Sequence, residues 1–196
     1  MSKISPENLR TQWKNITDPV SVIVFYSHAP GKKYNFFSNF WKHKEDFEFT
    51  VPEWCGKFSN YKVTVNFSEK LIMLCKASLM EDEESFHKIN LAKTPSECKK
   101  LGRKIKHWNE KLWQENVCQI AREIIRVKFN SSVELKEKLV QTGGSYIAEA
   151  SPDDHFWGVG MHANDGLINI PNKWKGTNIL GWALMTVRDE LNSVNE

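Results

Sequence analysis

The sequence has no apolar segment of the kind that a membrane span or an export signal requires. No hydrophobic run approaches the roughly 20 residues that cross a bilayer, and residues 1–6 contain no apolar signal core. Cysteine is also scarce, and the four present form no C-x-x-C motif and no Cys/His spacing typical of zinc. We expect a cytoplasmic protein without membrane association, in which Cys75, Cys98 and Cys118 are reduced thiols of the core.

Signatures of several enzyme classes are absent as well. The six histidines form no H-E-x-x-H or H-x-H pattern, and neither a G-x-S-x-G motif nor a P-loop occurs. Gly158 and Gly160 form an isolated G-x-G, but no β-α-β pattern surrounds it, so it is not the dinucleotide-binding fingerprint. We expect neither a metal ion nor an organic cofactor.

No internal repeat, low-complexity segment or Gly/Ser/Pro-rich linker divides the chain. Its 196 residues suffice for one substantial core and are few for two, and 40% hydrophobic with 26% charged residues is typical of a globular protein. We expect one domain over residues 21–194, preceded by an N-terminal extension of residues 1–20.

The overall charge excludes few classes of partner or substrate. Lysine and arginine total 27 against 24 acidic residues, and a net charge of +3 does not indicate nucleic-acid binding, although it does not oppose an anionic substrate. Basic residues do cluster over eight positions, at Lys99, Lys100, Arg103, Lys104 and Lys106. This stretch is either a solvated helix face or a patch that steers a phosphate.

Aromatic residues are numerous, with eight tryptophans and eleven phenylalanines. Flat rings are good walls for planar ligands, so we expect some of them to line a site. Within residues 36–40, Asn39 and Phe40 can hydrogen-bond and stack on a base or sugar. The alternative is a loop that anchors the core.

Hydrophobic spacing and helix-start signals predict an α+β protein that is predominantly helical, with a few short strands near its beginning. Helices are expected over residues 5–15, 68–80, 82–91, 94–106, 109–129, 132–142 and 177–194, and strands over residues 20–26, 47–51, 61–67 and 146–150. The strands at 47–51 and 61–67 alternate apolar and polar residues and are expected to pair.

Glu69 and Lys76 are the first candidates for chemistry. Seven residues are about two helical turns, so both side chains leave the same face of the predicted helix, roughly 10 Å apart. A carboxyl and an amine beside one cleft can carry out acid–base and covalent chemistry on one substrate. Lys76 follows an apolar run, and burial there would lower the pKa of its amine. The alternative is an ordinary surface ion pair.

Asp154 is the second candidate, in the run S-P-D-D-H-F-W-G. Trp157 can pack on a ligand that the backbone approaches at Gly158. The alternative is that Asp154 only caps a turn, because Ser-Pro-Asp-Asp favours turn starts.

Several ordered motifs carry a family resemblance. They are F-S-N-F at residues 37–40, S-E with a lysine seven residues later at 68–76, L-G-R at 101–103, Trp113 with Lys128-Phe129, E-x-S-P-x-D-x-x-W-G-x-G at 149–160, and G-x-N-x-L-G-x-x-L-M-x-x-R at 176–188. In this order and spacing, over about residues 22–192, the chain resembles the YbiA-like, or NADAR, family. Lys70 stands where that family has a histidine. Residues 41–67 and 161–175 are longer than usual and are expected to rim the pocket.

The resemblance implies a YbiA-like fold and an N-glycosidase that cleaves a ribose C1–N bond. The substrate would be either ADP-ribosylated guanine, as a nucleotide or in nucleic acid, or a phosphorylated ribosylamine of the riboflavin pathway. It also implies that Glu69, Lys76, Trp113 and Asp154 line the site, with Trp113 or Trp157 stacking on the base or sugar. Arg103 is a phosphate candidate by charge and position. The alternative is a silent module that binds ADP-ribose-like ligands.

Two mechanisms are open. In one, a neutral Lys76 attacks C1 and forms a Schiff base while Glu69 or Asp154 moves the proton. In the other, a carboxylate activates water against an oxocarbenium-like centre, as glycosidases do.

Overall fold

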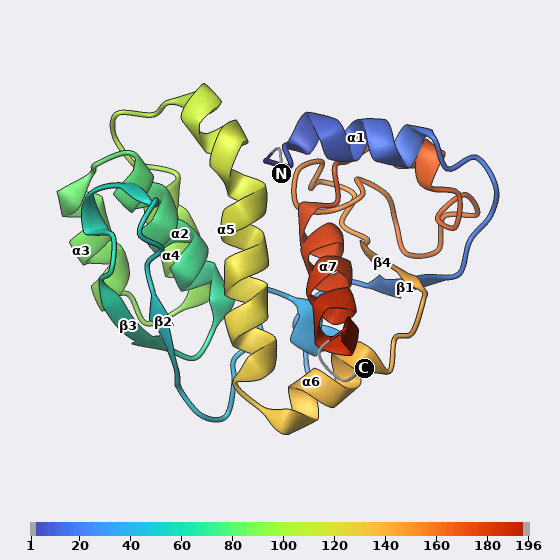
Figure 1. The fold of residues 1–196 in the computed structure, drawn as a ribbon, viewed down its shortest axis with the longest axis horizontal. Helices are drawn as coiled ribbons and strands as arrows, with labels where there is room; N and C mark the ends of the chain where they lie inside the picture. Colours follow the sequence, from blue (N-terminus) through green and yellow to red (C-terminus); the bar gives the residue numbers. More distant parts are fainter. Residues whose placement is uncertain (1–2, 194–196) are drawn as a thin grey trace.

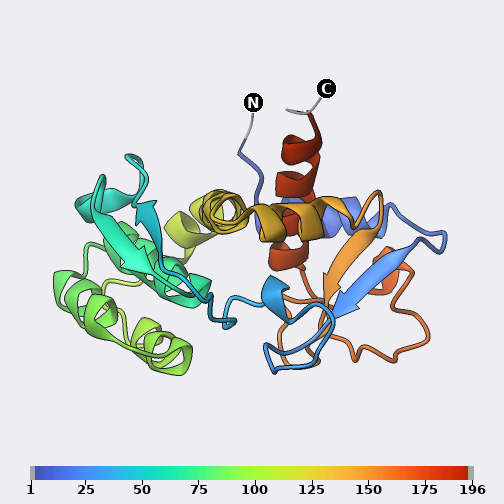
Figure 2. The ribbon, with the colours of Figure 1, turned by 90° about the horizontal axis from the view of Figure 1, so that it is seen from below.

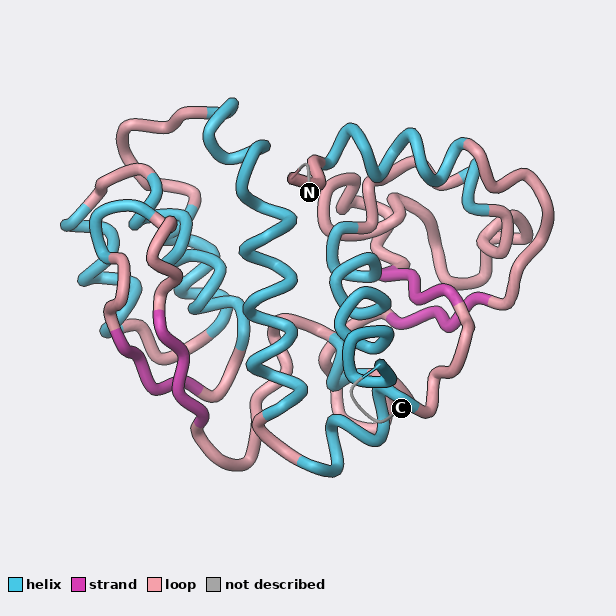
Figure 3. Tube along the Cα trace, viewed as in Figure 1, coloured by secondary structure: helices cyan, strands magenta, loops and turns pink. Residues whose placement is uncertain are grey.

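Helices are the predominant regular structure of the protein, and two small sheets lie on opposite sides of the long helix α5 (Figures 1 and 3). The structure is a computed structural model that describes residues 3–193. Its helices are α1 (Pro6–Lys14), α2 (Ser68–Leu79), α3 (Glu83–Leu91), α4 (Pro95–Gly102), α5 (Glu110–Asn130), α6 (Val133–Val140) and α7 (Ile179–Ser193), and its strands are β1 (Val22–Phe25), β2 (Phe47–Thr50), β3 (Lys62–Val65) and β4 (Tyr146–Glu149). The expected α+β class, predominantly helical, is confirmed.

The two sheets differ in how their strands are connected. Strands β2 and β3 pair antiparallel as expected, with Phe47 opposite Val65. Strands β1 and β4 pair in parallel, with Val22 opposite Tyr146, a partnership that the sequence pattern did not indicate. The chain between β1 and β4 builds the β2–β3 sheet and helices α2 to α6, so the β1–β4 pair closes the fold across its longest connection (Figure 1).

Helix α2 is the centre of one side of the molecule. It packs against α3, α4 and α5, and nearly all of its residues are buried. The run Leu71–Leu74 is apolar on every face, which is typical of a helix surrounded by other elements. A polar group on α2 therefore either pairs inside the protein or faces a cleft.

The other side of the molecule is built on α7, which packs against α5, α6 and β4 (Figure 2). Helix α1 lies over the same side, where Trp13 is buried and donates a hydrogen bond to the Thr177 carbonyl at 2.7 Å. Ser5 caps α1 as its sequence predicts. Helix α5 thus joins two sides that each carry part of the site.

One helix is shorter than predicted. Helix α4 ends at Gly102, not near Lys106, because the chain turns away. His107 has a positive φ of 55°, and the Lys106 amide donates to an Asp82 carboxylate oxygen at 2.7 Å. The basic residues at 99–106 therefore do not share one helix face. A short 3-10 helix also lies at Pro171–Lys173.

Other predictions follow the structure closely. All four cysteines are buried and free, which confirms the prediction for Cys75, Cys98 and Cys118. Across residues 3–193, no helix combines the length and apolar character that crossing a bilayer demands. The predicted helix end at residue 194 and the first two residues of the extension lie outside the described residues.

The contact between α7 and β4 depends on Gly181. A Cβ there would lie 2.1 Å from the Ile147 carbonyl oxygen, a backbone atom that cannot move aside. We expect Gly181→Ala to destabilise the protein by ~3 kcal/mol or more, lowering the melting temperature by roughly 10 °C. Gly166→Ala is the matched control, because nothing lies within 4 Å of a Cβ at Gly166. Equal melting temperatures for the two variants would refute this account.

Candidate active site

Lys76 lies in the last turn of α2 with its amine in an aromatic setting. Its Nζ donates a hydrogen bond to the Gly102 carbonyl at 3.0 Å and lies 4.4 Å from the Trp108 ring centre and 5.8 Å from that of Trp113. Burial lowers the pKa of the amine, although Glu110 and Glu69 oppose the shift. Among residues 3–193 no ion pair joins Lys76 to Glu69. The amine is therefore held in place without being neutralised by direct contact with a carboxylate.

A pocket of about 290 Å³ opens beside this amine. It is lined by Met73, Lys76, Trp108, Glu110, Trp113, Gln114, Phe156 and Trp157. Four of these side chains are aromatic, which suits a planar ligand. Trp113 and Trp157 were expected from the sequence, whereas Trp108, with 44% of its surface exposed, was not.

Glu69 lies two turns earlier on α2 and is almost completely buried. Its backbone N–H donates to the Asn39 carbonyl at 3.0 Å, which fixes the start of the helix against the loop that carries Asn39. Burial raises the pKa of the Glu69 carboxyl to about 7; the nearby charge of Lys99 opposes this and that of Asp154 adds to it. A carboxyl with this pKa can give or take a proton near neutral pH.

Asp154 combines capping with a free oxygen. Its Oδ1 accepts hydrogen bonds from the backbone N–H groups of Phe156 at 3.0 Å and Trp157 at 2.8 Å. Within the described part of the chain, Oδ2 has no hydrogen-bond partner. The capping role and a role toward a ligand are therefore compatible, because they use different oxygens.

The glycine after Trp157 has a structural reason. A Cβ on Gly158 would lie 2.6 Å from the Glu149 carbonyl oxygen. Gly158 thus allows the backbone to approach Glu149, whereas its proposed approach to a ligand stays a prediction.

Glu149, at the end of β4, forms a carboxyl cluster with Glu69 and Asp154, whose charges act on it. Burial, together with the nearby charges of Asp154 and Glu69, raises its pKa to about 8. Its Oε2 is buried without a hydrogen-bond partner among the described residues. The sequence placed Glu149 in a motif but gave no reason to single it out, since its closeness to Glu69 arises from the pairing of β4 with β1.

The loop of residues 38–40 joins the carboxyl cluster to two lysines. Lys128 is fully buried and donates to the Ser38 carbonyl at 2.9 Å, and burial lowers its pKa to about 7. The Lys99 Nζ lies 5.4 Å from the Phe40 ring centre. The Asn39 side-chain oxygen is buried without a described partner, so the contact that links Asn39 to the site is its backbone bond to Glu69.

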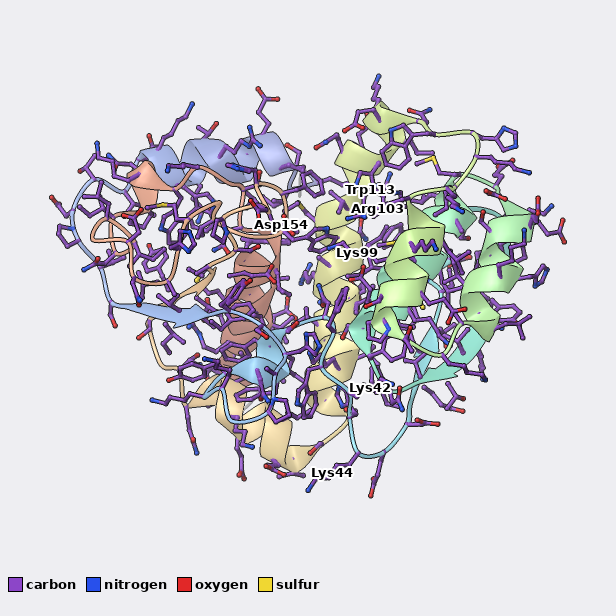
Figure 4. All side chains as sticks on the ribbon, turned by 180° about the vertical axis from the view of Figure 1, so that it is seen from behind. Lys42, Lys44, Lys99, Arg103, Trp113 and Asp154 are labelled. Carbon is purple, nitrogen blue, oxygen red and sulfur yellow. The ribbon has the colours of Figure 1, made fainter. Side chains whose placement is uncertain are left out.

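Figure 4 shows the two sides of the site, with Asp154 on the side of α7 and Lys99, Arg103 and Trp113 on the side of α4 and α5. Arg103 is the exposed residue that directly follows α4, and its charge acts on Glu69. Lys70, which replaces the family histidine, donates to the Asn90 carbonyl at 3.0 Å, at the end of α3. The departure at Lys70 is therefore accommodated by a contact with α3.

The two longer segments do not line the aromatic pocket, contrary to expectation. Its lining residues come from 73–114 and 156–157. In segment 41–67, Phe58 stacks on Phe86 of α3 at 3.9 Å between ring centres, and in segment 161–175, Trp174 packs on Trp13 of α1 at 5.3 Å. Both segments extend the core rather than this pocket.

Comparison with known proteins agrees with this architecture. The sequence model of the NADAR domain matches residues 24–192. N-glycosidase R617 of Acanthamoeba polyphaga mimivirus is 39% identical over 63% of this chain and 72% of its own length. The riboflavin biosynthesis protein VVA0006 of Vibrio vulnificus is 27% identical over 85% of this chain, which spans only 38% of that protein.

A solved structure resembles the whole fold. The NMR structure of the Escherichia coli protein YbiA superposes with a TM-score of 0.66 and 25% identity, covering 91% of this chain and 89% of YbiA. The family model covers most of the chain, and its motifs fall on the helices and loops that surround Lys76, Glu69 and Asp154. The chain therefore belongs to the NADAR family.

Proposed function

We propose that the protein is an N-glycosidase that hydrolyses the bond between ribose C1 and a nitrogen in a phosphorylated ribosyl substrate. The substrate is either an ADP-ribosyl-guanine adduct, as a nucleotide or in nucleic acid, or a ribosylamine phosphate of the riboflavin pathway. The names of R617 and VVA0006 support the reaction type and the second substrate class, respectively.

The observation that carries this proposal is the placing of Lys76 and Glu69. Both lie on α2: the amine lines an aromatic pocket, and the buried carboxyl, two turns earlier, has a pKa of about 7 and feels the charge of Lys76. Burial makes the amine easier to deprotonate, and it makes the carboxyl easier to protonate. The site can therefore offer an amine nucleophile and a carboxylic acid to one substrate, a combination that a binding module does not need.

The covalent route uses each group once. Protonated Glu69 donates to the ring oxygen, and the nitrogen lone pair opens the ribose to an iminium at C1. The neutral Lys76 amine adds to C1, a proton moves to the departing nitrogen, and the base leaves as a Schiff base forms on Lys76. Water adds to this imine with help from Asp154, releasing free Lys76 and a ribose with a free carbonyl group.

The competing route has no covalent step. The Asp154 carboxylate activates water against an oxocarbenium-like C1 while Glu69 protonates the leaving nitrogen. The aromatic pocket holds the base in both routes. Lys76 then contributes charge and position only.

The proposal is tested by offering two substrates side by side. ADP-ribosylated guanosine and a riboflavin-pathway ribosylamine phosphate are incubated with the protein, and released base or amine is measured by chromatography. We expect release from at least one substrate at a rate proportional to enzyme. Tight binding of ADP-ribose with no release from either substrate would favour the alternative, a silent binding module.

A further inference from the structure

Lys99 and Arg103, like the neighbouring Lys100 and Lys104, have no ion-pair partner among the described residues. Lys57, Lys88 and Lys106 each form an ion pair with Glu83 or Glu84. Within residues 3–193, neither Lys99 nor Arg103 forms an ion pair or donates a side-chain hydrogen bond. Two like charges one helical turn apart repel each other, so this pair costs stability unless an anion lies between them.

Lys99 is linked to Glu69 through the loop of residues 38–40. Its amine lies over the Phe40 ring, 5.4 Å from the ring centre, and Phe40 directly follows Asn39, whose carbonyl accepts the Glu69 N–H at 3.0 Å. The Phe40 N–H in turn donates to the Ser38 hydroxyl at 3.2 Å, which closes this short loop. The loop of residues 38–40 therefore contacts both the Lys99 amine and the backbone of Glu69.

The charge balance of the cluster also favours an anion. Lys99 and Arg103 act electrostatically on the carboxyl of Glu69 in α2, and Lys99 also acts on that of Glu149 in β4, while Asp154 acts on both carboxyls from the loop after β4. Burial raises the pKa values of Glu69 and Glu149 to about 7 and about 8, so near neutral pH both carry much of their proton. The cations then outnumber the remaining negative charge, which suits a phosphate dianion.

We propose that Lys99 and Arg103 form a phosphate clamp, and that Lys99, seated on Phe40, makes the site select phosphorylated over unphosphorylated ribosides. This inference rests on the proposed function, since it assigns the phosphate of the same substrate. The guanidinium offers a fork of N–H donors and the ammonium a point charge, a pair that can share the three terminal oxygens of a phosphate. The riboside phosphate on the clamp keeps the sugar within reach of Glu69.

The clamp is tested without catalysis by calorimetric titration with ribose 5-phosphate and with ribose. We expect the wild type to bind the phosphate form more tightly, Lys99→Met to lose that preference by about 10-fold to 100-fold, and Lys99→Arg to keep most of it. Lys100→Met, an exposed neighbour on the same helix, is the control and should bind like the wild type. Phe40→Leu should lose a few-fold, because the amine loses its support.

Kinetics provide a second readout. Lys99→Met should raise KM for a phosphorylated substrate with kcat little changed, and leave KM for its phosphate-free form unaltered. Equal affinity of the wild type for both sugars, or equal losses in Lys99→Met and Lys100→Met, would overturn the clamp. If ribose 5-phosphate binding requires Lys99 but no N-riboside is cleaved, the clamp stands and the proposed hydrolysis fails.

Discussion

Replacing Lys76 with alanine should reduce hydrolysis by on the order of 10³-fold to 10⁴-fold while leaving the fold intact. The loss is expected because the amine is the nucleophile of the covalent route, and no neighbouring group occupies its place between Trp108 and Trp113. The measurement is base or amine release under saturating substrate. Lys111→Ala, a variant of an exposed lysine at the start of α5, is the control and should keep wild-type activity.

Borohydride trapping separates nucleophilic from electrostatic roles of Lys76. During turnover with wild-type protein, reduction should fix the ribosyl group to the peptide that contains Lys76, and mass spectrometry should detect the added mass. The adduct should be absent in Lys76→Ala and present in Lys111→Ala. Full activity of the wild type without any adduct would instead favour direct attack by water.

The sequence predicted helix α2 and the spacing of Glu69 and Lys76 on it because both are local features. Glu69 and Lys76 belong to one helix, so their spacing follows from helical geometry once the helix is recognised. The helix starts were also readable, since Ser5, Thr94 and Asn109 cap the helices that they precede. Local rules determine both kinds of feature.

The remaining groups reach the site through long-range packing, which a single sequence does not reveal. Glu149 arrives because β4 pairs with β1 across about 120 residues of chain. Trp108 covers Lys76 because α4 ends early at Gly102 and the chain turns back at His107, against the predicted helix. Lys99 stood in a basic run, and only its contact with Phe40 separates it from its exposed neighbours.

Glu69→Gln should lower kcat/KM by about 10²-fold to 10³-fold and change its pH dependence. The pKa of about 7 means that the acid form of Glu69 is half populated near pH 7 and is lost as pH rises further. If Glu69 acts as the acid, the wild-type rate should fall on the alkaline side of pH 7. The glutamine variant cannot titrate, so its residual rate should lack this fall. Glu149→Gln is the comparison variant, because its rate should still fall on the alkaline side of pH 7, where Glu69 loses its proton.

Glu69→Gln should also be more stable than the wild type at pH 8. Such a gain in stability would exclude unfolding as the cause of the lost activity. Raising the Glu69 pKa from 4.5 to about 7 corresponds to ~3 kcal/mol of stability. The wild type loses none of this stability below pH 4.5, where Glu69 is protonated in both states. The loss grows between pH 4.5 and pH 7, because in that interval Glu69 ionises freely only in the unfolded chain, and it is constant above pH 7. Urea unfolding should therefore show that the free energy of unfolding of Glu69→Gln, relative to that of the wild type, is higher at pH 8 than at pH 5. A variant that is less stable at pH 8 than at pH 5, relative to the wild type, would contradict burial as the origin of the raised pKa, and with it the acid role of Glu69.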